Sequence, residues 1–178
     1  MNAGKNKFTT KTLAAMGLLT ALSILLTRLC SISVTPSVRI SLGGVPIILA
    51  GLLLGPAPGA LVGFAADLLG TLLLSAYGWY PPLAVAPMLT GLLPGLLGAG
   101  LLKELTYPRV LLTALPAAVL GSMLWSTYWL HLLYGTSFAA LLAVRAPIAL
   151  LTAAAESAVV FGLLKAKIGQ IAGVISRR

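Results

Sequence analysis

Residues 110–133 read VLLTALPAAVLGSMLWSTYWLHLL, a stretch without Asp, Glu, Lys or Arg. About 20 consecutive apolar residues are enough for a helix to cross the hydrocarbon core of a bilayer. The stretch therefore predicts a transmembrane helix, and similar apolar runs occupy most of the chain on both sides of it. Hydrophobic residues make up 59% of the sequence and charged residues only 8%, whereas about a quarter of an ordinary soluble domain is charged. The sequence predicts one integral membrane domain over residues 1–178, with no room for a separate soluble domain.

Glycine, proline and charged residues interrupt the apolar runs and mark where each predicted helix begins and ends. We expect six transmembrane helices, at about 12–29, 45–54, 60–75, 83–102, 110–133 and 141–164. The second is short for a full span, so we expect it to be re-entrant, tilted or extended backward into the polar connection 30–44. No small-residue cleavage site follows the first run, which is therefore expected to be a retained helix and not a signal peptide. The predicted fold class is an all-α integral membrane bundle.

The basic residues are divided unevenly between the two predicted sides of the membrane. With the N-terminus in the cytoplasm, nine of the 12 basic residues fall on the inner side. These nine are Lys5, Lys7, Lys11, Lys103, Arg109, Lys165, Lys167, Arg177 and Arg178. Because Lys and Arg are enriched in cytoplasmic loops, this distribution predicts that both termini are cytoplasmic. The net charge of +9 is scattered between apolar runs, a distribution that does not suit a nucleic-acid-binding stripe.

The three outer basic residues, Arg28, Arg39 and Arg145, are all arginines, whereas every lysine falls on the inner side. A guanidinium can bind a carboxylate through two parallel hydrogen bonds. Arginines on the outer side, against the orientation rule, therefore indicate an anionic ligand that arrives from outside. Snorkelling to lipid headgroups is the alternative, and for Arg28, at a helix end, both interpretations are open. We place Arg39 and Arg145 in loops and expect both to contact the ligand.

The aromatic residues gather in the predicted outer half. They include Tyr77, Trp79, Tyr80, Trp125, Tyr128, Trp129, Tyr134 and Phe138. An interfacial belt decorates both membrane faces, so a one-sided cluster favours a ring-stacking pocket. Trp125, Tyr128 and Trp129 stand at i, i+3 and i+4 and share one helical face; together with Tyr80 they are predicted to contact the ligand. For Tyr77 and Tyr134 a simple belt remains open.

Two acidic residues lie within predicted helices. Gly59, Gly63 and Asp67 recur every fourth residue, so Asp67 is expected to face a small-residue packing surface and not lipid. An unpartnered carboxylate at that depth costs about 2.5–3.5 kcal/mol on insertion scales. Asp67 either forms a hydrogen bond that ties two helices together or recognises donor groups of a ligand. For Glu156, nearer the inner end of its helix, we expect the structural role.

Residues for catalysis or metal binding are sparse. The acids are separated, His131 is the only histidine and Cys30 the only cysteine. No Ser-His-Asp or HExxH arrangement is present, and no GxxxxGK[ST] phosphate-binding loop. A metal site is therefore not expected, and His131 is expected to have a polar role at the interface. If the protein transports actively, partner subunits must supply the energy.

The first predicted helix carries Gly17 and Ala21, a small-xxx-small pair that permits close approach of another helix. That helix belongs either to a partner protein or to this bundle.

Several blocks of sequence resemble the substrate-binding S components of energy-coupling factor (ECF) transporters, small six-helix proteins that capture vitamins. These blocks are VRISLGGVP (38–46), LGP (54–56), GALVG (59–63), ADLLG (66–70) and TYWL (127–130), followed by LLYG (132–135), Phe138 and Arg145. The TYWL block with its downstream arginine is similar to the folate-specific branch. That branch usually has Asn before the Thr, where this chain has Ser126, and extra polar residues after the Arg, where Ala146-Pro147-Ile148 follow here.

The resemblance implies a folate-binding subunit without catalytic activity, in a prokaryotic cell membrane. Folate has a pterin ring, an aminobenzoate and a glutamate tail, which suit aromatic walls, a buried carboxylate and arginines respectively. The implied site comprises Arg28, Arg39, Asp67, Tyr80, Trp125, Ser126, Tyr128, Trp129 and Arg145. The implied partners are a membrane coupling subunit, contacted through Gly17 and Ala21, and two ATPase subunits; no cofactor and no metal is implied.

Three other functions stay open at this stage. The same architecture could serve a different anionic or heteroaromatic vitamin. A small-molecule channel or efflux protein is a second candidate, although a channel requires a polar stripe along several helices, whereas polarity here gathers at one end. An intramembrane enzyme is disfavoured by the scarcity of paired ionisable groups.

Overall fold

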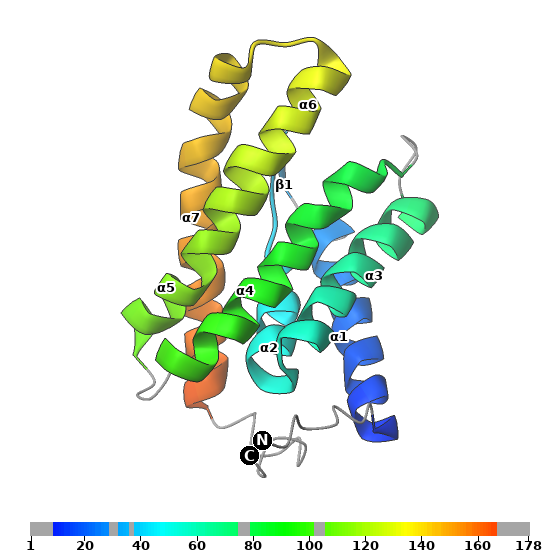
Figure 1. Cartoon of the computed structure of the whole chain (residues 1–178), viewed down its shortest axis with the longest axis vertical. Coiled ribbons are helices and arrows are strands. Elements are labelled where there is room, and N and C mark those ends of the chain that lie inside the picture. The colour runs from blue at the N-terminus through cyan, green and yellow to red at the C-terminus, as the bar shows by residue number, and fades with distance from the viewer. Residues whose placement is uncertain (1–8, 29–31, 36–37, 75–78, 102–105, 167–178) are drawn as a thin grey trace, which may run out of the picture.

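The chain forms a bundle of helices, with a short β-hairpin in the connection between its first two helices (Figure 1). This computed structural model describes residues 9–28, 32–35, 38–74, 79–101 and 106–166. The elements are α1 (Thr10–Arg28), β1 (Ile32–Thr35), β2 (Val38–Ile40), α2 (Gly44–Leu54), α3 (Pro56–Leu74), the 3-10 helix η1 (Pro81–Ala84), α4 (Val85–Leu101), α5 (Tyr107–Ala117), the π-helical segment η2 (Ala118–Trp125), α6 (Ser126–Tyr134) and α7 (Phe138–Lys165).

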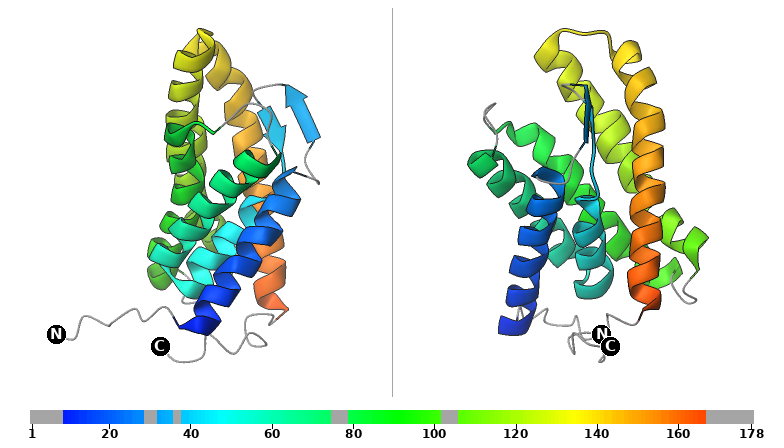
Figure 2. Two further views of the ribbon diagram at one scale, coloured as in Figure 1. Left: turned by 90° about the vertical axis from the view of Figure 1, so that its right-hand side faces the viewer. Right: turned by 180° about the vertical axis from the view of Figure 1, so that it is seen from behind.

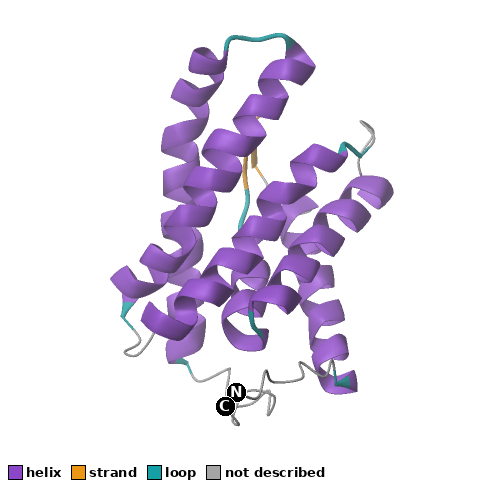
Figure 3. Ribbon diagram, in the orientation of Figure 1, coloured by secondary structure: helices purple, strands orange, loops and turns teal. Residues whose placement is uncertain are grey.

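The six predicted apolar helices are confirmed within the described residues. Five apolar helical stretches are long enough to span a bilayer, and α2 is the short sixth. The stretch predicted at 110–133 is a single span over 107–134, formed by α5, η2 and α6 in succession. The first residue of α1 and the last of α7 lie at the same end of the bundle (Figure 1), as an even number of spans requires. Figure 3 shows how completely helix dominates the architecture.

The polar connection between the first two spans contains an antiparallel hairpin that the sequence analysis did not predict. Ile32 pairs with Ile40 and Ser33 with Arg39. The hairpin stands above α2, between α1 and α7 (Figure 2). The short second helix is therefore not extended backward, because its preceding residues form strands. Eleven helical residues measure about 16 Å, so α2 occupies only the inner half of the bundle and the hairpin lies in the outer half.

Side chains on different faces of α2 pack against the neighbouring helices. Val45, Ile48 and Leu49 join side chains of α5 and α7 in one apolar cluster. Ile47 and Ala50 join α1 and α3 in a second cluster. A helix buried all round carries no polar stripe, which explains why its sequence shows an unbroken apolar run. The core on both sides of α2 is thus built from apolar side chains.

Glycines bring the backbones of α2, α3 and α4 into direct contact. A Cβ atom on Gly59 would lie only 2.6 Å from the Cα of Gly51 and from the carbonyl oxygen of Gly91. A Cβ on Gly63 would overlap the backbone carbonyl of Pro87 in α4. The small-residue packing surface predicted for α3 is therefore confirmed, with α4 and α2 as its partners. Close helix approach of this kind is how small residues stabilise bundles in lipid.

The start of α2 is held from two sides. Ser23 Oγ of α1 donates to the carbonyl oxygen of Gly43 at 2.7 Å, and the backbone N–H of Gly44 donates to Glu156 Oε1 of α7 at 2.8 Å. Glu156 is only 9% exposed, and its carboxylate satisfies one of the N–H groups that a helix start leaves without an intrahelical partner. The structural role predicted for Glu156 is confirmed: it caps α2 across the bundle.

Candidate functional site

Arg145 lies within a helix, in the third turn of α7, and not in a loop. The loop placement was wrong because α7 begins at Phe138, so the arginine is already helical. Arg145 Nε donates to Thr127 Oγ1 at 3.2 Å, and Nη2 donates to the carbonyl oxygen of Ser122 at 3.4 Å. Arg145 is partly buried. Through these two bonds the side chain bridges α7 to the α5–η2–α6 span.

The span that receives Arg145 changes its helical pitch at this point. Residues 118–125 are π-helical, and the N–H of Ser126 bonds to the carbonyl of Gly121, five residues earlier. Such π-helical turns are rare in proteins, and those that occur frequently lie at functional sites. Thr127 Oγ1 reaches the Ser122 carbonyl in the same way, at 3.3 Å. The wider turn therefore presents the Ser122 carbonyl to two side chains at once, those of Thr127 and Arg145.

The aromatic residues form a contiguous cluster around Trp129. Its ring contacts Tyr80, Trp125 and Tyr128, with centroids 6.0, 6.1 and 5.7 Å away. The indole N–H of Trp125 donates to the carbonyl of Pro82 at 2.7 Å, which fixes the start of the fourth span against α6. The shared helical face of Trp125, Tyr128 and Trp129 is therefore confirmed as a contact cluster, and Tyr80 joins it from the preceding loop.

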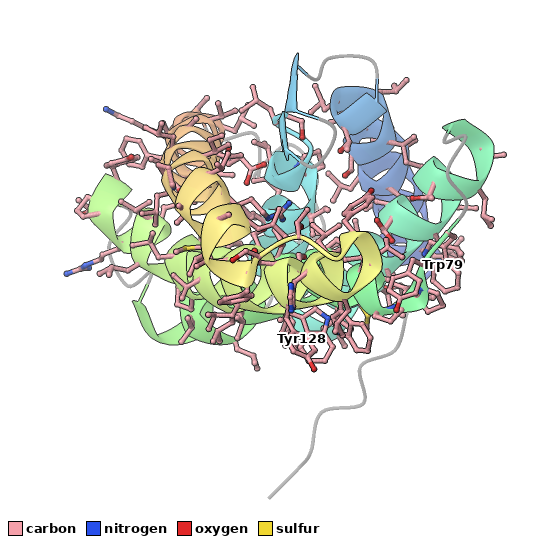
Figure 4. All side chains as sticks on the ribbon, turned by 90° about the horizontal axis from the view of Figure 1, so that it is seen from above. Trp79 and Tyr128 are labelled. Carbon is pink, nitrogen blue, oxygen red and sulfur yellow. The ribbon has the colours of Figure 1, made fainter. Side chains whose placement is uncertain are left out.

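The members of this cluster differ in where they point. Tyr128 is 51% exposed and lies on the side of the bundle opposite the hairpin (Figure 4). Trp125 is 39% exposed. Trp129 is more covered, and its indole N–H is buried without a hydrogen-bond partner among the described residues. Buried donors are almost always paired in folded proteins, so Trp129 is the member best suited to donate to a bound ligand. Ligand contact by Tyr128 stays a prediction, and its exposure suits the membrane interface.

Asp67 has a protein partner. Trp79 Nε1 donates to Asp67 Oδ2 at 3.1 Å, and the Trp79 ring packs edge-on against Phe64, one turn below the acid. This bond ties the loop before η1 to α3, as the structural interpretation of Asp67 expected. Trp79 and Tyr80 are adjacent, so the same short segment contacts α3 through one ring and Trp129 through the next. Recognition of a ligand by Asp67 stays a prediction.

Several predicted site residues fall partly or wholly outside the described residues. Arg28 is the last residue of α1 and Arg39 lies in β2, opposite Ser33, but the structure does not describe their side chains. Tyr77 and Cys30 lie outside the described residues. Ser126 is described and buried, 7% exposed, directly before Thr127. Arg39 belongs to a strand and not to an irregular loop.

The turn between α6 and α7 closes the outer end of the bundle. Gly135 adopts a left-handed conformation, φ 64°, which ends α6 and which glycine adopts without strain. His131 Nδ1 contacts the carbonyl oxygen of Thr136, and the His131 ring packs edge-on against Phe138. His131 thus has a polar partner in this turn, and its place at the membrane interface stays a prediction. This short turn places Arg145 and the Thr127 turn on facing helices.

Gly17 and Ala21 lie on the outside of the bundle. Both are exposed, and a Cβ on Gly17 would meet nothing within 4 Å. The buried side of α1 carries Met16, Thr20 and Ser23 instead. Among the residues that the structure describes, no helix of this bundle packs against the small-residue pair, and its surface is open to another helix.

Sequence reasoning missed which residues pair with one another: Thr127 and Ser122 with Arg145, Trp79 with Asp67, and Gly44 with Glu156. Thr127 is 18 residues from Arg145 and Glu156 is 112 residues from Gly44. No spacing rule connects positions so far apart. Thr127 stood inside the TYWL block, and its position beside Ser126 was the one available signal.

Comparisons with known proteins agree on the architecture. The sequence model of a family described as "ECF-type riboflavin transporter, S component" matches residues 7–175. A curated relative from Clostridium novyi (strain NT), the folate transporter FolT, is 28% identical over 130 residues, which cover 73% of this chain and 74% of the relative. A crystal structure of FolT bound with folic acid aligns with a TM-score of 0.78 and 28% identity, over 90% of this chain and 96% of that chain. The S component for biotin from an ECF-type ABC transporter aligns with a TM-score of 0.64 and 24% identity, over 92% and 95% of the two chains, and shows the shared fold.

Proposed function

The chain belongs to the family of ECF-type riboflavin transporter S components, and we propose that folate is the vitamin it captures. In this proposal the protein binds folate from outside a prokaryotic cell and delivers it to an ECF module for import. One observation carries the choice of folate: Arg145 lies partly buried in the outer part of α7, where it bonds to Thr127 and Ser122 of the span that carries the aromatic cluster. A guanidinium can bind a carboxylate of a glutamate tail through two parallel hydrogen bonds.

The aromatic cluster suits the pterin ring at the other end of folate. Tyr80, Trp125 and Trp129 offer ring faces and edges within one cluster, and aromatic pairs contribute about 0.5–1.5 kcal/mol beyond the apolar area that they bury. The buried indole N–H of Trp129 is a donor for a ring nitrogen or carbonyl of a pterin. The likeness to the relative and the solved structure named for folate points the same way.

Riboflavin is the second candidate, because the matching family description names it. Its ring system would also suit an aromatic cluster, but its ribityl chain is neutral and carries no carboxylate. Arg145 would then have no anionic group to bind, and its position inside a membrane helix would bring no ionic stabilisation to the ligand. Arg145 therefore favours folate.

A direct binding titration tests this proposal. Detergent-purified protein, without ATP or partner subunits, should show saturable quenching of Trp fluorescence by folate, with calorimetry as an independent measurement. Riboflavin and biotin, each added at the same concentration, should bind at least 100-fold more weakly. Binding of riboflavin in place of folate would refute the assignment of the cargo while leaving the family unchanged.

Delivery requires partners, which we propose are a membrane coupling subunit and two ATPase subunits. Gly17 and Ala21 form an exposed flat strip on α1, and neighbouring Leu13 and Leu18 are exposed as well. The absent side chains allow the backbone of another helix to come close. We propose that this strip of α1 contacts the coupling subunit.

Filling the strip should separate uptake from binding. Gly17→Leu or Ala21→Leu is expected to lower ATP-dependent folate uptake at least tenfold, because the added side chain keeps the partner helix away. Folate affinity and thermal stability of the isolated protein should stay unchanged, since a Cβ at Gly17 would meet no atom of the described residues within 4 Å. Ala155→Leu, at an exposed position of α7, is the matched control and should transport normally. Loss of folate binding along with uptake would contradict the docking role.

A further inference from the structure

The short segment 79–82 joins α3 to the aromatic cluster through three contacts. At its start, Trp79 Nε1 donates to Asp67 Oδ2 of α3 at 3.1 Å. At its end, the carbonyl oxygen of Pro82 accepts from Trp125 Nε1 at 2.7 Å. Between these two anchors the Tyr80 ring packs against the Trp129 ring, with centroids 6.0 Å apart. The segment is therefore fixed at both ends, and its middle residue contacts the centre of the cluster.

The residues between the two anchors form a stiff piece of backbone. A residue before proline is restricted to an extended conformation, and Tyr80, which precedes Pro81, has φ −114° and ψ 106°. Pro81 and Pro82 have their own φ angles fixed by their rings. The N–H of Leu83 closes the turn by donating to the carbonyl oxygen of Tyr80 at 3.0 Å. Because this backbone bends little, the place at which Trp79 is held also sets the position of the Tyr80 ring.

Trp79 is held on α3 by both its ring and its N–H. The ring packs edge-on against Phe64, with centroids 6.1 Å apart and planes at 81°. Phe64 and Asp67 are three residues apart, so both lie on the same side of α3. That helix is itself fixed, because Gly59 and Gly63 bring its backbone against those of α2 and α4. Figure 4 shows Trp79 on the α3 side of the bundle and Tyr128 on the α6 side.

Trp129 is the residue whose orientation depends on this segment. Its indole N–H is buried and has no hydrogen-bond partner among the described residues, so no bond of its own fixes the ring. Its direction is set by the rings packed around it, and Tyr80 is the one among them that comes from outside its own helical span. A donor already held in its binding orientation loses less side-chain entropy when a ligand arrives.

We propose that Trp79 is a positioning residue: bonded to Asp67, it holds Tyr80 against Trp129 and so fixes the orientation in which Trp129 meets the ring of the ligand. This inference rests on the proposed function, because it takes the aromatic cluster to be the site of the pterin ring. Trp79 acts through Tyr80 and does not touch the ligand. Asp67 serves as the anchor of Trp79 on α3.

A substitution that leaves the Asp67 carboxylate in place tests the proposal. Trp79→Phe keeps an aromatic ring beside Phe64 and removes the N–H, so that folate should bind about tenfold more weakly. Folate diamide, in which both glutamate carboxylates are converted to amides, should weaken by the same factor, because it carries the same pterin ring. In the background of Tyr80→Ala, Trp79→Phe should cause no further loss, since the two residues act through one contact. Full additivity of the two losses would overturn the positioning role.

The matched control is Tyr107→Phe, at the opposite end of the bundle. Tyr107 also combines a hydrogen bond to a neighbouring helix, from its hydroxyl to the carbonyl oxygen of Ala154 at 3.3 Å, with an edge-on contact to a phenylalanine, Phe161. This variant reports what the loss of one such bond between helices does to the bundle alone. Its folate affinity should equal that of wild type, and the same weakening as in Trp79→Phe would show that both bonds only stabilise the fold.

A measurement without any ligand keeps this inference distinct from the choice of cargo. The protein has three tryptophans, whose indole N–H signals can be assigned by nuclear magnetic resonance with one Trp→Phe variant for each. Hydrogen exchange at the Trp129 signal should become about tenfold faster in Trp79→Phe and stay unchanged in Tyr107→Phe. Phe64→Leu removes only the edge contact with Trp79 and should accelerate the same exchange about threefold. This milder variant carries the test if Trp79→Phe does not fold.

The two proposals then fail in different ways. If wild-type protein binds no folate but Trp129 exchanges faster in Trp79→Phe and Phe64→Leu, the proposed cargo is wrong and the positioning role stands. If folate binds and the exchange at Trp129 is the same in all variants, the positioning role is wrong.

Discussion

Replacement of Arg145 with alanine is expected to weaken folate binding by about 2–5 kcal/mol, the usual cost of removing one partner of a buried, hydrogen-bonded charge pair. At about 1.4 kcal/mol for each tenfold change, the dissociation constant should rise roughly 30-fold to several-thousand-fold. The folate diamide should lose far less, because its tail carries no charge to be left without a partner. Arg145→Lys should lie between wild type and alanine, since lysine keeps the charge but not the planar fork. Equilibrium titration of purified variants measures all three.

Two controls separate a ligand contact from a contribution to the fold. Arg109→Ala removes an arginine from the first turn of α5, at the opposite end of the same bundle, and should leave folate affinity unchanged. Thermal unfolding of Arg145→Ala shows how much of the loss comes from the broken bonds to Thr127 and Ser122. An equal loss of affinity for folate and for its diamide would mean that Arg145 supports the helix packing and does not bind the tail.

Enlarging Gly91 is expected to have the largest effect on folding. A Cβ on this residue would overlap the backbone carbonyl of Gly59, and neither backbone can move without displacing a whole helix. Overpacking in a core usually costs about 1–3 kcal/mol, and more when no flexible side chain can yield. Gly91→Ala should therefore lower the thermal midpoint markedly, and Gly91→Leu should prevent recovery of a monodisperse protein. Size-exclusion chromatography and thermal unfolding in detergent measure these outcomes.

The same helix offers the comparison that makes this result interpretable. A Cβ on Gly100, also in α4, meets nothing within 4 Å, so Gly100→Ala tests the backbone effect alone. Alanine favours a helix over glycine by roughly 0.8–1.0 kcal/mol, and this variant should be as stable as wild type or more stable. A Gly91→Ala protein that melts at the wild-type temperature would contradict the close crossing of α3 and α4.

The candidate site was only partly accessible to sequence reasoning. The helical spacing of Trp125, Tyr128 and Trp129 predicted their contact, because neighbours along one helix need only local geometry. The same spacing could not tell which rings are exposed: Tyr128 and Trp125 are, whereas Trp129 is more covered. Arg145 was predicted to contact the ligand because it is an arginine on the outer side of the membrane, whereas its predicted placement in a loop was wrong. The hairpin was missed because strands of three and four residues are too short to show a period.

The pattern of apolar runs and basic residues was enough to predict a membrane bundle of six helices and which end of each helix lies with the termini. This follows because every backbone polar group in lipid must be bonded within its own segment, so that apolar length alone defines a span. The contacts of single residues depend on how the helices pack: Arg145 with Thr127 and Ser122, the start of α2 with Glu156, and the exposed face of Gly17 and Ala21. The hydrogen bonds among them join residues that are far apart in the sequence and lie on different helices. They depend on how helices rotate and cross, which is set by backbone contact at glycines such as Gly59 and Gly91 and leaves no periodic trace in the sequence.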